Sequence, residues 1–78
     1  MKTLRFTLRE GESHIPLIQL LKAANCVGSG GDAQAAVTGE MVRRNGETEL
    51  RKRAKCVAGD IIEFADFRIE IAANPPAV

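Results

Sequence analysis

The spacing of hydrophobic residues changes from a period of two to a helical period and back within 78 residues, and this change constrains the fold more than any other feature. Apolar and polar side chains alternate over residues 3–8 and 68–71, as in half-buried strands, and residues 61–64 form a further apolar strand pattern. Residues 17–24 place leucine and alanine at i, i+3, i+4 and i+7, the spacing of one helix face. A chain this short holds one hydrophobic core, so the sequence predicts a single α+β domain.

Two helices are predicted, over residues 16–25 and 30–38. Pro16 suits the first turn of the first helix, because its missing N–H would have no intrahelical partner there. Ser29 is the predicted N-cap of the second helix, and Gly39 is its predicted C-terminal stop. The alanines of the second helix allow a close approach to its neighbour, so we expect a compact helix-loop-helix.

Turn residues after the helices predict a small, mainly antiparallel sheet. Asn45-Gly46 favours the positive φ angles of a type I′ turn and therefore predicts a hairpin. Residues 74–78 contain two successive prolines, which lack the N–H that a sheet requires. We expect one α+β domain over residues 1–73, with the helix-loop-helix packed on the sheet, and a flexible tail over residues 74–78.

The inventory of reactive side chains is small. Cys26 and Cys56 are too few for a disulfide framework, and with His14 as the single histidine the sequence offers no metal-ligand set. A lone histidine with no nucleophile beside it gives no catalytic pair. The sequence contains neither an apolar run long enough for a membrane nor a signal-peptide pattern. We expect a cytoplasmic, non-enzymatic protein with free thiols, without a cofactor, a metal or a small-molecule substrate.

Charge is distributed unevenly, although the total is only +1. Residues 43–55, the basic segment, contain six basic and two acidic residues, a net charge of +4, whereas residues 56–78 have a net charge of −3. Such asymmetry suggests that one face of the domain meets an anionic partner. The simpler interpretation is a solvated basic loop.

The densest part of the basic segment is Arg51-Lys52-Arg53-Ala54-Lys55, the basic run, with Arg43-Arg44 across the predicted hairpin. Arginine and lysine supply forked donors and mobile charges to phosphate oxygens, the main source of affinity for nucleic acids. The chain has no Trp or Tyr, and core packing accounts for its three Phe, so stacking on unpaired bases is not expected. These features favour recognition of folded RNA by its backbone and shape. The alternative is a protein-interaction module that docks an acidic partner.

Four stretches together resemble a stand-alone S-four-type RNA-binding domain, as in short bacterial proteins that consist of this domain alone. They are Ser29-Gly30-Gly31-Asp32-Ala33-Gln34, Asn45-Gly46-Glu47, the basic run, and Val57-Ala58-Gly59-Asp60-Ile61-Ile62-Glu63. The resemblance extends over residues 15–71. It implies a helix-loop-helix, the αL RNA-binding motif, packed on a small sheet, and it implies binding to structured RNA through the helices and the adjoining basic loop.

The resemblance also implies where RNA is contacted, on the two helices and on the basic segment. The implied contacts are Lys22, Ser29, Gly30, Gln34, Arg44, Arg51, Lys52, Arg53 and Lys55, and Arg43 joins them by its charge. Many family members place a basic residue where Gln34 stands and an apolar strand residue where Arg44 stands. We therefore expect more of the binding to come from the basic segment. The predicted protein is a monomer that binds ribosomal RNA, on the ribosome, or another folded RNA.

Overall fold

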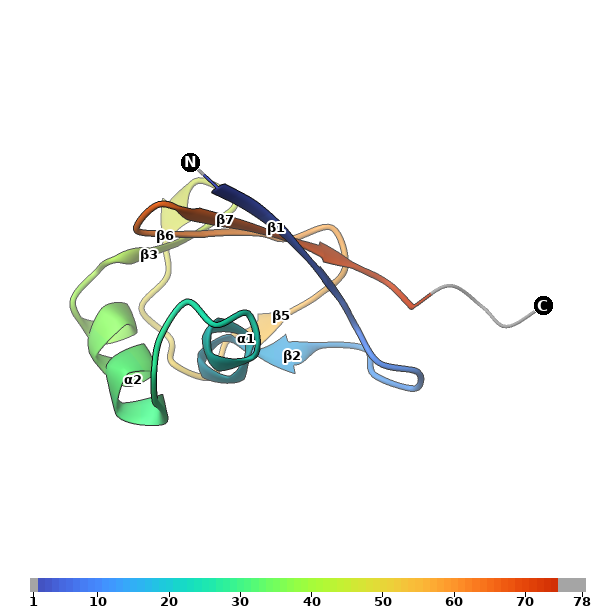
Figure 1. Cartoon of the computed structure of the whole chain (residues 1–78), viewed down its shortest axis with the longest axis horizontal. Coiled ribbons are helices and arrows are strands. Elements are labelled where there is room, and N and C mark those ends of the chain that lie inside the picture. The colour runs from blue at the N-terminus through green and yellow to red at the C-terminus, as the bar shows by residue number, and fades with distance from the viewer. Residues whose placement is uncertain (1, 75–78) are drawn as a thin grey trace.

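The structure is a computed structural model that describes residues 2–74, so the predicted tail lies, apart from Asn74, outside the described residues. A five-stranded sheet forms one layer, and two helices with a two-stranded ribbon lie against one of its faces (Figure 1). The elements of this part of the chain are β1 (Lys2–Thr7), β2 (Ile15–Pro16), α1 (Leu17–Ala23), α2 (Gly30–Thr38), β3 (Val42–Arg44), β4 (Glu47–Thr48), β5 (Lys55–Cys56), β6 (Ile61–Phe64) and β7 (Phe67–Ala72). The predicted α+β class is confirmed.

The larger sheet has the strand order β1-β7-β6-β3-β4. The pairs β7–β6, β6–β3 and β3–β4 are antiparallel, in agreement with the mainly antiparallel sheet predicted. In contrast, β1 and β7 are parallel, from Lys2 opposite Phe67 to Thr7 opposite Ala72. The smaller sheet consists of β2 and β5, which pair antiparallel. The sequence patterns predicted neither the parallel pair nor this ribbon.

The β3–β4 hairpin turns at the predicted position. Asn45 and Gly46 both have positive φ, 52° and 87° respectively, which is the requirement of a type I′ turn. The Asn45 side chain also reaches β6, because its Oδ1 accepts a hydrogen bond from the Ile61 N–H at 2.9 Å. The hairpin is therefore attached to the strand beside it as well as closed at its own turn.

The first helix is shorter than predicted, and the second has the predicted bounds. Pro16 is extended (φ −60°, ψ 141°) and pairs with Lys55 in the ribbon, so α1 begins one residue later than expected. It ends at Ala23, and Asn25 has a φ of 61°, which a right-handed helix cannot include. In α2, the predicted N-cap is confirmed, since Ser29 Oγ accepts a hydrogen bond from the Asp32 N–H at 3.2 Å, and Gly39 is the C-cap.

The helices and the sheet share one hydrophobic core. Its largest fully buried side chains come from α1, α2, β3, β5, β6 and β7, and they are Leu17, Leu20, Leu21, Val37, Val42, Cys56, Ile62 and Ile69. Burying a side chain such as leucine or isoleucine contributes about 1.5–3 kcal/mol each, so this core holds both helices on the sheet. Cys56 and the half-buried Cys26 are both free thiols, and burial raises the pKa of each, that of Cys56 to about 11.

Candidate nucleic-acid interface

Backbone atoms of the basic run dock on the start of α1. The first turn of α1 has neither a side-chain cap nor an acidic residue, so its N–H groups need other acceptors. The carbonyl oxygen of Ala54 accepts from the Leu17 N–H at 2.9 Å, and that of Lys52 accepts from the Ile18 N–H at 3.2 Å. Because the Ala54 side chain is also buried, the basic run is fixed against α1 with its charged side chains directed to solvent.

An open groove of about 730 Å³, the α1–α2 groove, lies between α1, the start of α2 and the basic run. It is lined by Pro16, Ile18, Gln19, Lys22, Gly30, Gln34, Lys52 and Arg53. Five of these were singled out by the sequence and come from three separate segments: Lys22, Gly30, Gln34, Lys52 and Arg53. The lining contains three cationic side chains and no carboxylate, so it attracts anions.

Gln19 lines the α1–α2 groove, whereas Ser29 does not. Ser29 precedes Gly30 and uses its hydroxyl oxygen to cap α2, and it does not line the groove. Gln19 lines the groove although the sequence reasoning did not propose it as a contact. The signal for Gln19 was present, because residues three apart on a helix are neighbours and Gln19 stands three before Lys22.

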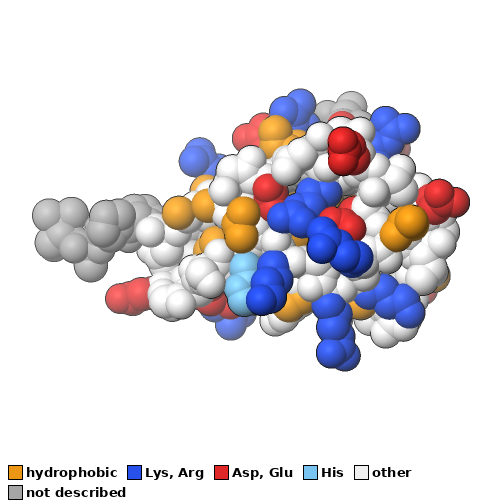
Figure 2. Space-filling view, turned by 180° about the vertical axis from the view of Figure 1, so that it is seen from behind, with side chains coloured by type: hydrophobic (Ala, Val, Ile, Leu, Met, Phe, Trp, Pro, Cys, Tyr) orange, Lys and Arg blue, Asp and Glu red, His pale blue; other side chains and the backbone are white. Residues whose placement is uncertain are grey.

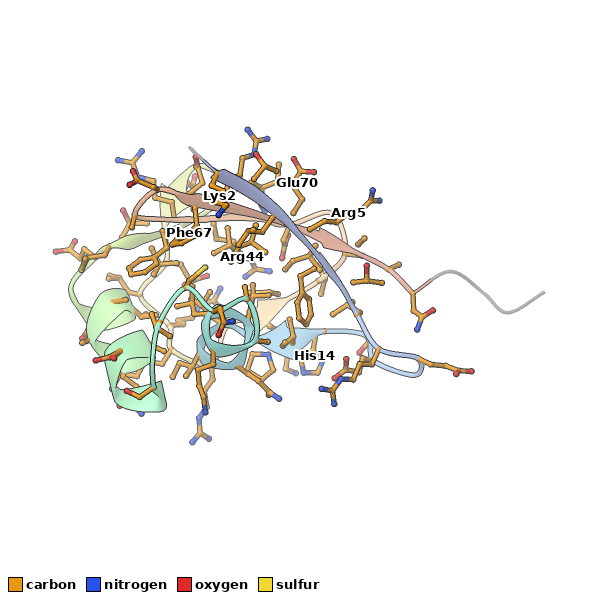
Figure 3. All side chains as sticks on the ribbon, viewed as in Figure 1. Lys2, Arg5, His14, Arg44, Phe67 and Glu70 are labelled. Carbon is orange, nitrogen blue, oxygen red and sulfur yellow. The ribbon has the colours of Figure 1, made fainter. Side chains whose placement is uncertain are left out.

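Arg44 points into the protein, toward the ribbon side of the sheet (Figure 3). Its Nε and Nη2 donate to Oδ2 of Asp60 at 3.0 and 2.8 Å, and Nη2 also donates to the Lys55 carbonyl oxygen at 2.8 Å. Its Nη1 donates to Glu49 Oε1 at 3.4 Å. The guanidinium of Arg44 therefore joins β3 to the Asp60 turn, to β5 and to the segment after β4, away from the α1–α2 groove.

Asp60 and Glu49 are the buried carboxylates that face Arg44, with 7% and 9% of their surfaces exposed. Burial alone would raise the pKa of Asp60, but hydrogen bonds from the Val57 N–H, from Asn45 Nδ2 and from Arg44 outweigh it and lower that pKa. Hydrogen bonds from Arg51 are the main cause of the lowered pKa of Glu49, against the opposing effect of burial. Both groups are thus stabilised as anions among arginines.

Arg43 lies on the other face of the sheet. Successive residues of a strand point to opposite faces, so the burial of Val42 beneath the helices places Arg43 on the side away from them. It pairs with Thr48 and Glu63 of the neighbouring strands. Arg5 and Glu70 point to the same outer side (Figure 3), so this face carries charges of both signs. The structure separates Arg43 from the cationic residues of the α1–α2 groove.

The rest of the basic run forms a second depression, of about 440 Å³, lined by Arg44, Arg51, Arg53, Ala54 and Lys55. Arg51 is largely exposed, with 74% of its side chain accessible, and it forms an ion pair with Glu49. Lysine and arginine side chains gather in the middle and along the lower margin of the face shown in Figure 2, with acidic side chains between some of them. Arg53 lines both depressions and therefore stands between them.

Two further properties concern residues 2–74. In this range no helix is long and apolar enough to cross a membrane. Nor does the described part of the chain bring three or more His, Cys, Asp or Glu side chains together in a way that could hold a metal ion.

The protein is a small α+β domain in which a helix-loop-helix packs on a mixed sheet, as the sequence predicted. A cationic groove lies beside the two helices. The family model of the S4 domain matches residues 6–72, so the chain belongs to the S4 domain family. This confirms the family that the sequence resembles.

Relatives of known structure or name support the same assignment. The chain is 37% identical over 60 residues to the protein of Escherichia coli (strain K12) named "Putative RNA-binding protein YbcJ", an alignment that covers 77% of this chain and 86% of YbcJ. It matches the YbcJ protein of Shigella flexneri, which is named as uncharacterized, to the same extent. The solution structure of E. coli YbcJ, described as revealing an αL motif involved in RNA binding, superimposes with a TM-score of 0.69 at 35% identity, over 88% of this chain and 86% of YbcJ.

Proposed function

We propose that this protein binds structured RNA through the α1–α2 groove. One observation carries the proposal: the fold brings Lys22, Gly30, Gln34, Lys52 and Arg53 from three segments to one groove without a carboxylate in its lining. The name of the E. coli relative YbcJ, and the αL motif described in its structure, support RNA as the ligand.

Phosphate groups are the part of RNA that this groove suits. Lys22 and Lys52 supply point charges, and Arg53 supplies a planar fork of donors that matches phosphate oxygens. Gly30 begins α2, whose first N–H groups lack intrahelical partners and favour negative charge. The amide of Gln34 adds a neutral donor. Contacts of this kind position a complex but carry little sequence information.

Recognition by shape fits the absence of a stacking platform. The three phenylalanines lie in β1, β6 and β7 and are partly buried, and the chain has neither Trp nor Tyr. Unpaired bases are usually bound by stacking on exposed aromatic rings, whereas folded RNA is recognised by backbone and shape. The proposed ligand is accordingly ribosomal RNA or another folded RNA.

In this proposal the protein is a monomer in the cytoplasm, where its RNA target can be part of the ribosome. It acts by binding RNA and does not catalyse a reaction. Free Cys26 and Cys56 fit a reducing compartment. Within residues 2–74, the hydrogen-bond partner of the His14 ring is the Ser13 hydroxyl, 3.3 Å from Nδ1, and not a carboxylate that could support acid–base chemistry. The whole domain, over residues 1–73, serves as one RNA-binding unit, without a cofactor or a small-molecule substrate.

The salt dependence of binding tests this proposal. Log affinity falls with log salt at a slope of about −0.7 to −0.9 for each phosphate neutralised. We expect Lys52→Gln/Arg53→Gln to weaken binding to a structured RNA hairpin and to flatten the slope by about 1.5, since two contacts are lost. The matched control is Lys2→Gln/Arg5→Gln, which removes the same charge from exposed positions on β1, outside the α1–α2 groove. The control should change the slope by less than half as much.

Circular dichroism of each variant verifies that it is folded. Equal slopes for the two double variants would show that net charge, not the groove, determines binding. If the wild-type protein failed to bind RNA even at low salt, RNA binding itself would be refuted, and a protein-interaction module with an acidic partner would be the better description.

A further inference from the structure

Glu49 is an acidic residue buried within the most basic part of the chain. Its carboxylate accepts hydrogen bonds from three groups of Arg51, namely the backbone N–H at 3.2 Å, Nε at 3.2 Å and Nη2 at 3.3 Å. On the other side it accepts from Arg44 Nη1 at 3.4 Å. A carboxylate repels RNA phosphates, so Glu49 should weaken RNA binding if net charge alone determined affinity. We therefore ask which interaction of Glu49 could favour binding.

The position of Glu49 is itself fixed. Its backbone N–H donates to the Val42 carbonyl oxygen at 2.9 Å, which extends the β3–β4 ladder by one residue. Arg44, which holds one carboxylate oxygen, is in turn held by Asp60 and by the Lys55 carbonyl oxygen. Asp60, Arg44, Glu49 and Arg51 therefore form a continuous chain of ionic contacts that begins at a buried turn residue and ends at the surface.

Arg51 is the exposed end of this chain. Glu49 holds Nε and Nη2, so one edge of the guanidinium is occupied while the remaining N–H donors, on Nη1 and on the outer side of Nη2, are left for another acceptor. With 74% of the side chain accessible, these donors can be reached from solvent. A free arginine side chain has considerable rotamer freedom, and holding it before binding lowers the entropy lost on binding.

The held guanidinium lies at the depression that Arg51 lines together with Arg53 and Lys55. No carboxylate lines this depression, whereas Glu47 and Glu49 line an adjoining depression to which Arg51 also contributes. Arg53 separates it from the α1–α2 groove, so an RNA backbone that occupies the groove can continue past Arg53 into it.

We propose that this depression binds a second RNA phosphate and that Glu49 is the positioning residue that presents the Arg51 guanidinium to it. This inference rests on the proposed RNA binding. It deepens the RNA binding already proposed for the basic run, and it assigns a binding role to an acidic side chain.

The effect of Glu49→Gln has opposite signs under the two explanations. Loss of a negative charge near RNA should strengthen binding if only net charge matters, whereas loss of the anion that orients Arg51 should weaken it. We expect Glu49→Gln to weaken RNA binding about three- to tenfold, the range for ordering one flexible side chain. The matched control is Glu47→Gln, an exposed glutamate two residues earlier on the same strand face, which should leave binding unchanged or slightly tighter.

Two further variants separate positioning from a general structural effect. In an Arg51→Ala background, Glu49→Gln should cause no further loss of affinity, because its effect passes through Arg51. Arg51→Lys keeps the charge at an exposed position but lacks the planar fork, so it should also weaken binding about threefold. This variant tests the inference without any change in the buried carboxylate.

The inference is overturned if Glu49→Gln binds RNA as tightly as Glu47→Gln, if Glu49→Gln weakens binding equally in the Arg51→Ala background, or if Arg51→Lys binds like wild type. These results leave the α1–α2 groove standing, provided that Lys52→Gln/Arg53→Gln flattens the salt slope. Failure of the wild-type protein to bind RNA at low salt would instead remove both proposals.

Discussion

Replacing Asp60 with Asn should destabilise the folded protein by about 2–3 kcal/mol. Asp60 accepts four hydrogen bonds, from the Val57 N–H, from Asn45 Nδ2 and from Nε and Nη2 of Arg44. Asn at this position keeps one carbonyl oxygen, so it loses an acceptor as well as the charge that balances Arg44.

The magnitude follows from the burial of the pair. Breaking a buried ion pair by removing one partner costs about 3–5 kcal/mol. Arg44 keeps its contacts with Glu49 and with the Lys55 carbonyl oxygen, and 21% of its side chain is exposed, so the cost falls somewhat below that range. A chain of 78 residues has a total stability of roughly 4–12 kcal/mol, so this loss is a large fraction of it.

The pH dependence gives a second measurement. Because the pKa of Asp60 is lower in the folded than in the unfolded protein, its contribution is present above the unfolded value, about 4, and is lost as pH falls through the folded value. Urea unfolding followed by circular dichroism should therefore show the full difference between wild type and Asp60→Asn at pH 7. The difference between the two proteins should shrink as the pH falls below about 4 and disappear below the folded pKa of Asp60.

Asp66→Asn is the matched control, because Asp66 is an exposed aspartate in the β6–β7 turn and the substitution makes the same chemical change. We expect it to alter the free energy of unfolding by less than about 0.5 kcal/mol. If Asp60→Asn at pH 7 were no more destabilising than Asp66→Asn, the ion pair would not contribute to stability and the reasoning would be refuted.

Three further expectations concern separate parts of the molecule. The Cys56 thiol is fully buried and its pKa is raised to about 11, so at pH 8 it should react with a disulfide reagent only after unfolding. The half-buried Cys26 should react in the folded protein, and equal reaction rates for the two thiols would contradict this expectation. Gly59 has a φ of 93°, so Gly59→Ala should cost about 1–2 kcal/mol in urea unfolding, and a neutral result would show that the turn can rearrange. His14 does not line either cationic depression, so His14→Ala should change RNA affinity less than twofold, and a larger loss would place RNA beside the start of β2.

Local signals predicted the fold where local chemistry determines it. Ser29 and Gly39 gave the bounds of α2, and Asn45-Gly46 gave the hairpin, because each depends on the conformation of one or two residues. The β1–β7 pair joins segments that are far apart in the chain, and no single-strand pattern records which partner a strand takes. The ribbon is two residues long on each side, too short to show a period.

The sequence predicted which basic residues are present near the candidate site. It did not predict which of them line the cationic depressions and which form ion pairs or lie on the opposite face of the sheet. Charge density identified the basic segment, yet a charge does not reveal its partner, and the ion pair between Arg44 and Asp60 spans 16 residues of sequence. One signal was available and not used: adjacent residues of a strand face opposite ways, so Arg43 and Arg44 could not both belong to one surface. The sequence shows that Glu49 lies near several basic residues, but its role could be inferred only from its hydrogen bonds with Arg44 and Arg51.

The pairing of β1 with β7 determines when the protein can finish folding. During synthesis β1 is made before its partner β7, because Phe67 follows Lys2 in the chain and translation adds about 5–20 residues per second. Both helices and the β3–β4 hairpin can form while β1 has no partner, and Leu4 and Phe6 of β1, half-buried in the folded protein, remain exposed to other chains in that interval. A nascent chain arrested before β7 would expose Leu4 and Phe6 on an unpaired strand, and an unpaired strand is prone to pair with other chains.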